Sequence, residues 1–184
     1  MAKHYNPQRH HRRSIRRPGY DYARAGKYFV TICSHERACL FGDIASDQII
    51  LNEYWRIVGE EWVRTAMIRA EIILEDYVVM PNHIHGIIVL RESTTPASHA
   101  GSDILAGPRP GSLGAIVGGF KAAACSRINL LRGTPGFPVW QRDFHDHIIR
   151  NDDEYRRIVA YIRNNPLRWA EDTLYQADNN PPHV

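Results

Sequence analysis

The sequence has little of several features that would restrict its class. Its three cysteines, Cys33, Cys39 and Cys125, lack the paired short spacings of a disulfide framework or a structural zinc site, which is typical of a reducing cytoplasm. No apolar run is long enough to cross a bilayer. The polar, basic start, residues 1–17, is not a secretory signal. We therefore expect a cytoplasmic protein without a membrane segment.

Acidic residues are absent from the first 17 positions, although the whole chain has a net charge of only +3. This segment carries six positive charges, so the rest of the chain has a net charge of −3. We predict that residues 1–19 are a flexible arm that lies along a phosphate backbone, with a solvated tail as the alternative. The arm residues expected to bind DNA are Arg12, Arg13, Arg16 and Arg17. Lysine supplies only three of the 23 basic residues, which fits phosphate recognition and equally fits genomic base composition.

The remaining pattern predicts one domain, residues 20–175, followed by a loose tail at 176–184. Residues 91–111 form a long connection rich in serine, threonine, glycine and proline, and Phe41-Gly42-Asp43 is predicted to be a turn. The order β-α-β-β-α-β-α predicts an α+β, ferredoxin-like split βαβ sandwich, in which two helices cover one face of a four-stranded antiparallel sheet. The expected strands span 26–33, 71–80, 83–90 and 139–149, and the helices span 53–69, 113–131 and 152–164.

Two histidines, His83 and His85, are two positions apart on the strand that this plan places in the middle of the sheet. Side chains alternate across a strand, so both imidazoles leave the same face while Ile84 enters the core. The alternative is a pair of ordinary hydrogen-bonded histidines. Because two titratable side chains between very apolar strands are hard to explain by packing, we favour a shared metal ion.

The last helix offers a phenol and an amide. Tyr161 and Asn165 are four apart, so they share a face at the edge of the apolar stripe. From packing alone, Tyr161 seals the helix to the sheet and Asn165 is a helix-terminus residue before Pro166. Together with the histidines and the cationic arm, they form the set needed for metal-assisted phosphoryl transfer to tyrosine. The histidines must be neutral to bind metal, so activity should fail in mild acid.

These motifs resemble a known family. The run Val78-Val79-Met80-Pro81-Asn82-His83-Ile84-His85-Gly86 is similar to the HUH signature of single-tyrosine transposases. The run Val159-Ala160-Tyr161-Ile162-Arg163-Asn164-Asn165-Pro166 resembles the tyrosine helix of the REP-associated tyrosine transposases. Residues 28–33 and 140–151 resemble that family's first and last strands, so the likeness runs from about Tyr20 to Trp169.

The resemblance implies an HUH endonuclease fold with a C-terminal tyrosine-bearing helix, acting on single-stranded DNA beside palindromic hairpins in a bacterial, nucleoid-associated setting. It implies Mg²⁺ or Mn²⁺ held by His83 and His85, with Asn165 completing the metal shell where the family often has glutamine. Tyr161 would attack the phosphate to give a 5′-phosphotyrosine link and a free 3′-OH, which then allows rejoining. Lys121 and Arg127, on the helix at 113–131, are further candidates for backbone binding, while Asp146 or His147 would border the site.

Three interpretations stay open from the sequence. The first is the transposase, the second is a DNA-hairpin-binding protein that no longer cuts, and the third is a hydrolase that uses metal-bound water. Tyr155 is the alternative nucleophile. The protein is a monomer or a homodimer that donates its tyrosine in trans. The hypothesis of an ion shared by the two imidazoles and the phenol requires imidazoles that open to solvent rather than rings turned into the protein interior.

Overall fold

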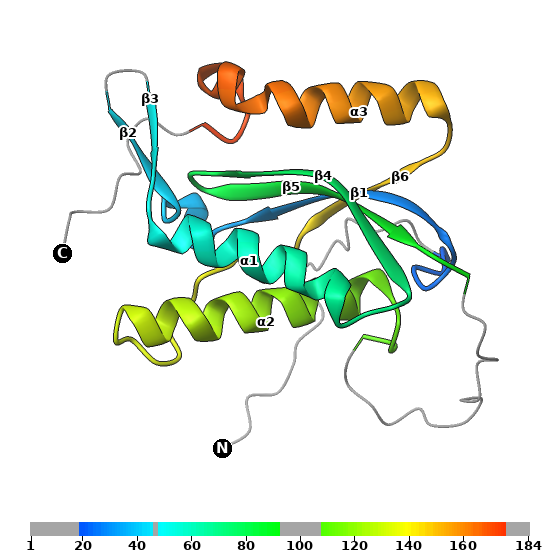
Figure 1. Cartoon of the computed structure of the whole chain (residues 1–184), viewed down its shortest axis with the longest axis horizontal. Coiled ribbons are helices and arrows are strands. Elements are labelled where there is room, and N and C mark those ends of the chain that lie inside the picture. The colour runs from blue at the N-terminus through cyan, green and yellow to red at the C-terminus, as the bar shows by residue number, and fades with distance from the viewer. Residues whose placement is uncertain (1–18, 46–47, 93–107, 176–184) are drawn as a thin grey trace, which may run out of the picture.

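The computed structural model describes residues 19–45, 48–92 and 108–175 (Figure 1). The basic arm up to residue 18, the middle of the long connection and the tail from residue 176 lie outside the described residues. What the sequence predicts for those three segments therefore stays a prediction. Among the described residues, no helix is both long and apolar enough to cross a membrane.

Four strands form one antiparallel sheet in the order β4-β5-β1-β6. The strands are β1 (Gly26–Cys33), β4 (Ile72–Met80), β5 (His83–Leu90) and β6 (His145–Ile149). Helices α1 (Glu53–Met67) and α2 (Leu113–Leu131) lie against one face, and α3 (Asp152–Asn164) lies over the other (Figure 1). This arrangement confirms the predicted α+β plan and places β5, with its histidines, in the centre of the sheet.

Each long helix begins where a side-chain oxygen satisfies free backbone N–H groups. The Asn52 side chain accepts hydrogen bonds from the backbone N–H groups of Tyr54 and Trp55, Ser112 caps α2, and Asn151 caps α3. At its other end α3 stops at Asn164, and the chain continues as a 3₁₀ turn, η2 (Asn165–Glu171). Pro166 lies in the first turn of η2, as expected for a residue that disfavours helix before it.

The hydrophobic core lies between the sheet and the α1–α2 layer. Ile84 and Ile88 of β5 are fully buried there with Trp62 of α1 and Phe120 of α2, whose rings meet edge to face. Gly86 of β5 has no room for a side chain, because a Cβ there would lie 2.5 Å from Cζ2 of Trp62. The strand thus sends Ile84 and Ile88 into this core, while His83 and His85 lie on the opposite face together with Ile87 and Val89.

Two local predictions were wrong. Phe41-Gly42-Asp43 is not a turn, because Phe41 is a fully buried anchor and Gly42 opens β2 (Gly42–Ala45), which pairs with β3 (Gln48–Leu51) as a separate hairpin. The strand predicted at 139–149 is regular only over β6. A single bridge joins Ser34 to Trp140, and the residues that follow form a loop because their carbonyls bond to a lysine instead of a neighbouring strand.

Candidate metal centre and tyrosine site

Both predicted histidine ligands lie on the face of the sheet covered by α3. Ile84 between them points into the core, as the strand alternation predicted. Their rings are 4.3 Å apart between centroids. His83 is fully buried and His85 is 3% exposed, so the pair is far less open than the sequence hypothesis required.

Asn82, in the two-residue turn before β5, fixes the tautomer of His83. Its amide nitrogen donates to the carbonyls of Arg37 (3.2 Å) and Leu174 (2.8 Å), which leaves its Oδ1 facing Nδ1 of His83 at 2.8 Å. An amide oxygen only accepts, so Nδ1 of His83 carries the hydrogen and Nε2 has a free lone pair. That Nε2 is buried without a hydrogen-bond partner. A histidine that binds a metal usually donates one ring N–H to an oxygen of the protein and keeps the lone pair of the other nitrogen for the metal.

His85 has a more flexible partner. The hydroxyl of Thr31, directly across β1 and β5, lies 2.8 Å from Nδ1 of His85. A hydroxyl both donates and accepts, so it supports either tautomer of the ring. Nε2 of His85 is therefore able to carry a hydrogen or to present a lone pair without any change in the backbone.

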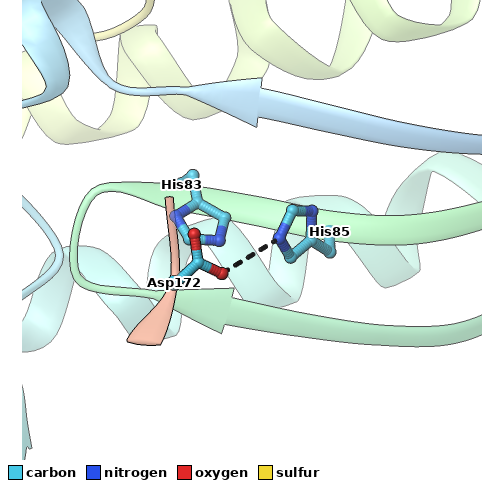
Figure 2. A group of neighbouring side chains, drawn as sticks. All are labelled: His83, His85 and Asp172. Carbon is cyan, nitrogen blue, oxygen red and sulfur yellow. Dashed lines mark ion pairs between the residues drawn. The ribbon is translucent and has the colours of Figure 1, made fainter. Parts of the chain in front are cut away.

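The third group is Asp172, which the sequence analysis missed. Its carboxylate faces both imidazoles (Figure 2), and Oδ2 is 3.9 Å from Nε2 of His85. One ligand atom from each of the three residues lies within 4.8 Å of the others, close enough to hold one metal ion. Asp172 follows η2 and is on no helical face shared with Tyr161, so no periodicity in the sequence pointed to it.

Tyr161 reaches the same point from α3, within one chain. Its hydroxyl donates to Oδ2 of Asp172 at 3.0 Å and lies 3.1 Å from Nε2 of His85. The side chain as a whole is 45% exposed, so solvent reaches the edge of the site that Tyr161 forms even though the histidine rings are covered. Two imidazoles, a carboxylate and a phenol thus converge.

Asn165 lies beside these groups but contacts Asp172 rather than the histidines. Its amide nitrogen donates to Oδ2 of Asp172 at 2.7 Å, while its Oδ1 is buried without a partner. An unpartnered amide oxygen is available as a ligand or as an acceptor. The metal role that the family resemblance gives to Asn165 stays a prediction.

The charges of the site set its titration. Burial lowers the pKa of both imidazoles, and for His83 the neighbouring His85 lowers it further. Burial alone would raise the pKa of Asp172, but its interactions with His85, the Leu174 N–H and Asn165 hold that pKa well below its usual value. Burial and then the charge of Asp172 raise the pKa of Tyr161. At neutral pH the site therefore holds neutral imidazoles, a carboxylate and a protonated phenol.

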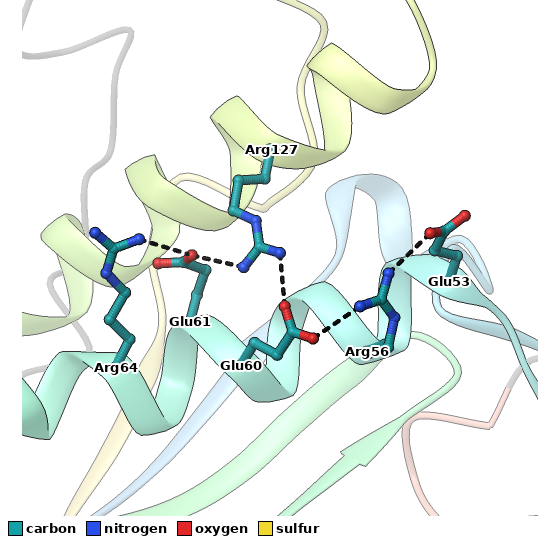
Figure 3. Close-up of polar contacts among 6 residues, drawn as sticks. All are labelled: Glu53, Arg56, Glu60, Glu61, Arg64 and Arg127. Carbon is teal, nitrogen blue, oxygen red and sulfur yellow. Dashed lines mark hydrogen bonds and ion pairs between the residues drawn. The ribbon is translucent and has the colours of Figure 1, made fainter.

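The two helical candidates for DNA binding lie on α2, across the sheet from this site. Arg127 pairs with Glu60 (2.6 Å) and Glu61 (2.8 Å) of α1, within the ion-pair network of Figure 3. The ammonium of Lys121 donates to the carbonyls of Gln141, Arg142 and Asp143. Both side chains therefore have structural partners, and their contact with DNA stays a prediction, as does that of the arm arginines.

The remaining candidates are His147 on β6 and Tyr155 on α3. Nε2 of His147 is 2.6 Å from a carboxylate oxygen of Glu154. Tyr155, the alternative nucleophile, lies under the ammonium of Lys27, which is 4.0 Å from its ring centre. Neither residue belongs to the group formed by His83, His85 and Asp172. The geometry favours Tyr161 over Tyr155.

Comparison with known proteins places the chain among relatives. No family model matches it. An uncharacterised protein of Haemophilus influenzae (strain ATCC 51907 / DSM 11121 / KW20 / Rd) is 38% identical over 180 residues, which are 95% of this chain and 99% of that protein. The chain belongs to the family of this Haemophilus protein.

A solved structure relates the fold of this chain to that of a transposase. A REP-associated tyrosine transposase, solved bound to a REP hairpin, superposes with a TM-score of 0.54 and 22% identity, covering 84% of this chain and 72% of that one. A second solved protein, from Deinococcus radiodurans R1, is more distant, with a TM-score of 0.41, 16% identity and coverage of 81% of this chain and 95% of that one. The chain therefore has the fold of a tyrosine transposase, as the sequence motifs predicted.

Proposed function

We propose that this protein is a metal-dependent single-strand DNA transposase that cleaves and rejoins DNA beside palindromic hairpins through a 5′-phosphotyrosine intermediate. The observation that carries the proposal is the convergence of His83, His85, Asp172 and the Tyr161 hydroxyl at one point of one chain. The hairpin in the structurally similar transposase supports the choice of substrate. Because the tyrosine and histidines meet within one chain, we infer that a monomer cleaves in cis.

The donor set fits a divalent cation. His83 offers a buried nitrogen that has no other partner, His85 offers Nε2, and Asp172 offers a carboxylate oxygen. Two imidazoles and a hard oxygen suit Mn²⁺, and with added oxygen ligands from DNA or Asn165 they suit Mg²⁺. When bound, the cation would polarise the scissile phosphate and offset the charge that develops during transfer.

The residues of the chain then supply attack and proton transfer. The phenol of Tyr161 is protonated at neutral pH and its hydrogen points at Oδ2 of Asp172. As the tyrosine oxygen forms its bond to phosphorus, this proton has an acceptor at that atom, and the bond from phosphorus to the 3′ oxygen breaks. The leaving 3′ oxygen takes up a proton to give the free 3′-OH. The reverse attack by that hydroxyl, or by another, rejoins the strand without an external energy source.

A second candidate function is hairpin binding without cleavage. The near-complete burial of both imidazoles favours it, because a scissile phosphate reaches them only after Tyr161 or the segment that carries Asp172 moves. Both functions share the fold and differ in whether the tyrosine becomes covalently linked to DNA.

Labelled single-stranded hairpin DNA incubated with Mn²⁺ separates the two candidates. The wild-type protein should give an adduct that survives denaturing electrophoresis, and Tyr161→Phe should give none while it still binds the hairpin. Tyr155→Phe is the matched control and should form the adduct at the wild-type level. Tight binding by wild type without any adduct would support the binding protein, and cleaved DNA without an adduct would support a hydrolase that uses metal-bound water.

A further inference from the structure

A cavity opens on the histidine face of the sheet, beside the proposed metal centre. Its volume is about 240 Å³. Its floor is Thr31 and Cys33 of β1, which pair directly with His85 and His83 across the sheet. Adjacent strands are only about 4.8 Å apart, so a group in the cavity is the immediate neighbour of a group held by the histidines. The other lining residues are Gln141, Arg142, Asp143, Phe144 and His145.

The wall of the cavity is a loop held in place from behind. The backbone N–H of Gln141 donates to the carbonyl of Cys33 at 3.0 Å. The Lys121 ammonium, reaching from α2, donates to the carbonyls of three successive residues, at 2.9 Å for Arg142 and 3.5 Å for Asp143. Burial lowers the pKa of Lys121, which is the cost of placing this ammonium under the loop. The cavity is therefore preformed, which reduces the conformational entropy lost when it is filled.

The loop presents polar side chains to the cavity. Within residues 19–45, 48–92 and 108–175, the structure gives the side chains of Gln141 and Arg142 no hydrogen bond or ion pair of their own, and the Asp143 carboxylate interacts electrostatically with the Lys121 ammonium. They offer an amide, a guanidinium and a carboxylate to the cavity, whose lining also includes Phe144, a half-buried residue packed against the core. Hydrogen-bond donors and acceptors of this kind recognise the edge of an unpaired nucleobase.

The geometry points to a subsite for one unpaired nucleobase, the base next to the scissile phosphate, bound in this cavity by the 141–145 loop. The inference rests on the proposed function, because it takes the phosphate to lie at the histidines. The volume is below the roughly 300–1,000 Å³ of pockets for drug-sized ligands, which suits a ligand group as small as one base. The subsite would give the enzyme a sequence requirement at one position beside the cut.

The experiment combines an abasic nucleotide in the DNA with substitutions in the loop. Tyr161→Phe protein is titrated in Mn²⁺ with single-stranded hairpin oligonucleotides, each carrying one abasic nucleotide near the cut site mapped with wild-type protein. One abasic position should weaken binding about tenfold, the size typical of losing one base contact. Adding Gln141→Ala with Asp143→Ala should weaken binding of the intact oligonucleotide about tenfold and remove the effect of that abasic position. Glu53→Ala on α1, across the sheet, is the matched control and should keep both the affinity for the intact oligonucleotide and the effect of the abasic position.

A crosslink tests the same contact without a change in the protein. An oligonucleotide carrying 5-iodouracil at the sensitive position should crosslink under light to the tryptic peptide spanning 143–150, which contains Phe144 and His145. The subsite would be refuted if no abasic position changed binding or cleavage, or if the loop variant kept the effect of the abasic position. Either result would leave the proposed function intact. Absence of any single-strand binding would overturn the proposed function, and the subsite with it.

Discussion

Changing Asp172 to asparagine tests which residue completes the metal centre. The carboxylate accepts three hydrogen bonds, from the Tyr161 hydroxyl and the Asn165 amide at Oδ2 and from the Leu174 N–H at 2.7 Å at Oδ1. An asparagine keeps one acceptor oxygen and turns the other position into a donor. At least one bond to a charged acceptor is therefore lost, which costs about 1.5–3 kcal/mol of unfolding free energy in the metal-free protein.

The effect on metal binding should be larger. Losing even an outer-sphere partner of a metal ligand typically costs about 10–100-fold in affinity, so losing a carboxylate ligand should cost about 100-fold or more. Calorimetric titration with Mn²⁺ measures the affinity, and urea unfolding with and without Mn²⁺ measures the linked stabilisation. Asp76→Asn is the matched control, because Asp76 pairs with the exposed Arg163 on the same side of the sheet and belongs to no metal group.

The comparison with Asn165→Ala decides the assignment. If Asp172 is the third ligand, Asp172→Asn should lose Mn²⁺ affinity, and Asn165→Ala should lose less, because Asn165 contacts the carboxylate and not the imidazoles. Wild-type Mn²⁺ affinity in Asp172→Asn together with its loss in Asn165→Ala would refute this reasoning and assign the shell as the family resemblance does.

Three further predictions concern packing, titration and the arm. Gly86→Ala should destabilise the fold by about 1–3 kcal/mol, because its Cβ would clash with Trp62, whereas Gly118→Ala, with open space around it, should not destabilise it; thermal unfolding checks both. Burial keeps the pKa of His83 in the folded protein below its value in the unfolded chain, so only the unfolded chain takes up a proton at this ring as the pH falls below about 6.5. The free energy of unfolding of the metal-free protein, measured with urea, should therefore decrease below that pH. The decrease should be smaller in His83→Gln, which lacks this titrating group. Deleting residues 1–17 should weaken single-strand affinity and flatten its dependence on salt, and an unchanged salt slope would show that the arm does not touch DNA.

The part of the site that the sequence predicted depends on short-range rules. Strand alternation is enough to put His83 and His85 on one face and Ile84 on the other. Helical spacing is enough to put Tyr161 at the edge of the apolar stripe of α3. The end of the last helix before Pro166 depends on residues within a few positions of each other, and it too was predicted correctly.

What the sequence did not predict depends on contacts between distant segments. Asp172 enters the site from an irregular segment after η2, and Asn82 orients His83 only because its amide is fixed by carbonyls of Arg37 and Leu174. Neither relation has a period that a single sequence displays. The burial of the histidines depends in the same way on Trp169, which packs over His83 and is itself 4% exposed.

These distant contacts make the metal centre depend on how the segment after α3 docks. The Asn82 amide donates to the carbonyl of Leu174, and the Trp169 ring lies between the rings of His83 and Tyr175. Asp172, in the same segment, completes the candidate ligand group. The contacts that hold this segment on the sheet thus also position the third ligand and cover the imidazoles. A cation bound by Asp172 and the histidines would stabilise the docked state by linkage, since an undocked segment removes one ligand. Under the proposed function, access of a phosphate and retention of the ion place opposite demands on this segment, and movement of Tyr161, whose side chain is 45% exposed, would admit a phosphate without undocking the segment.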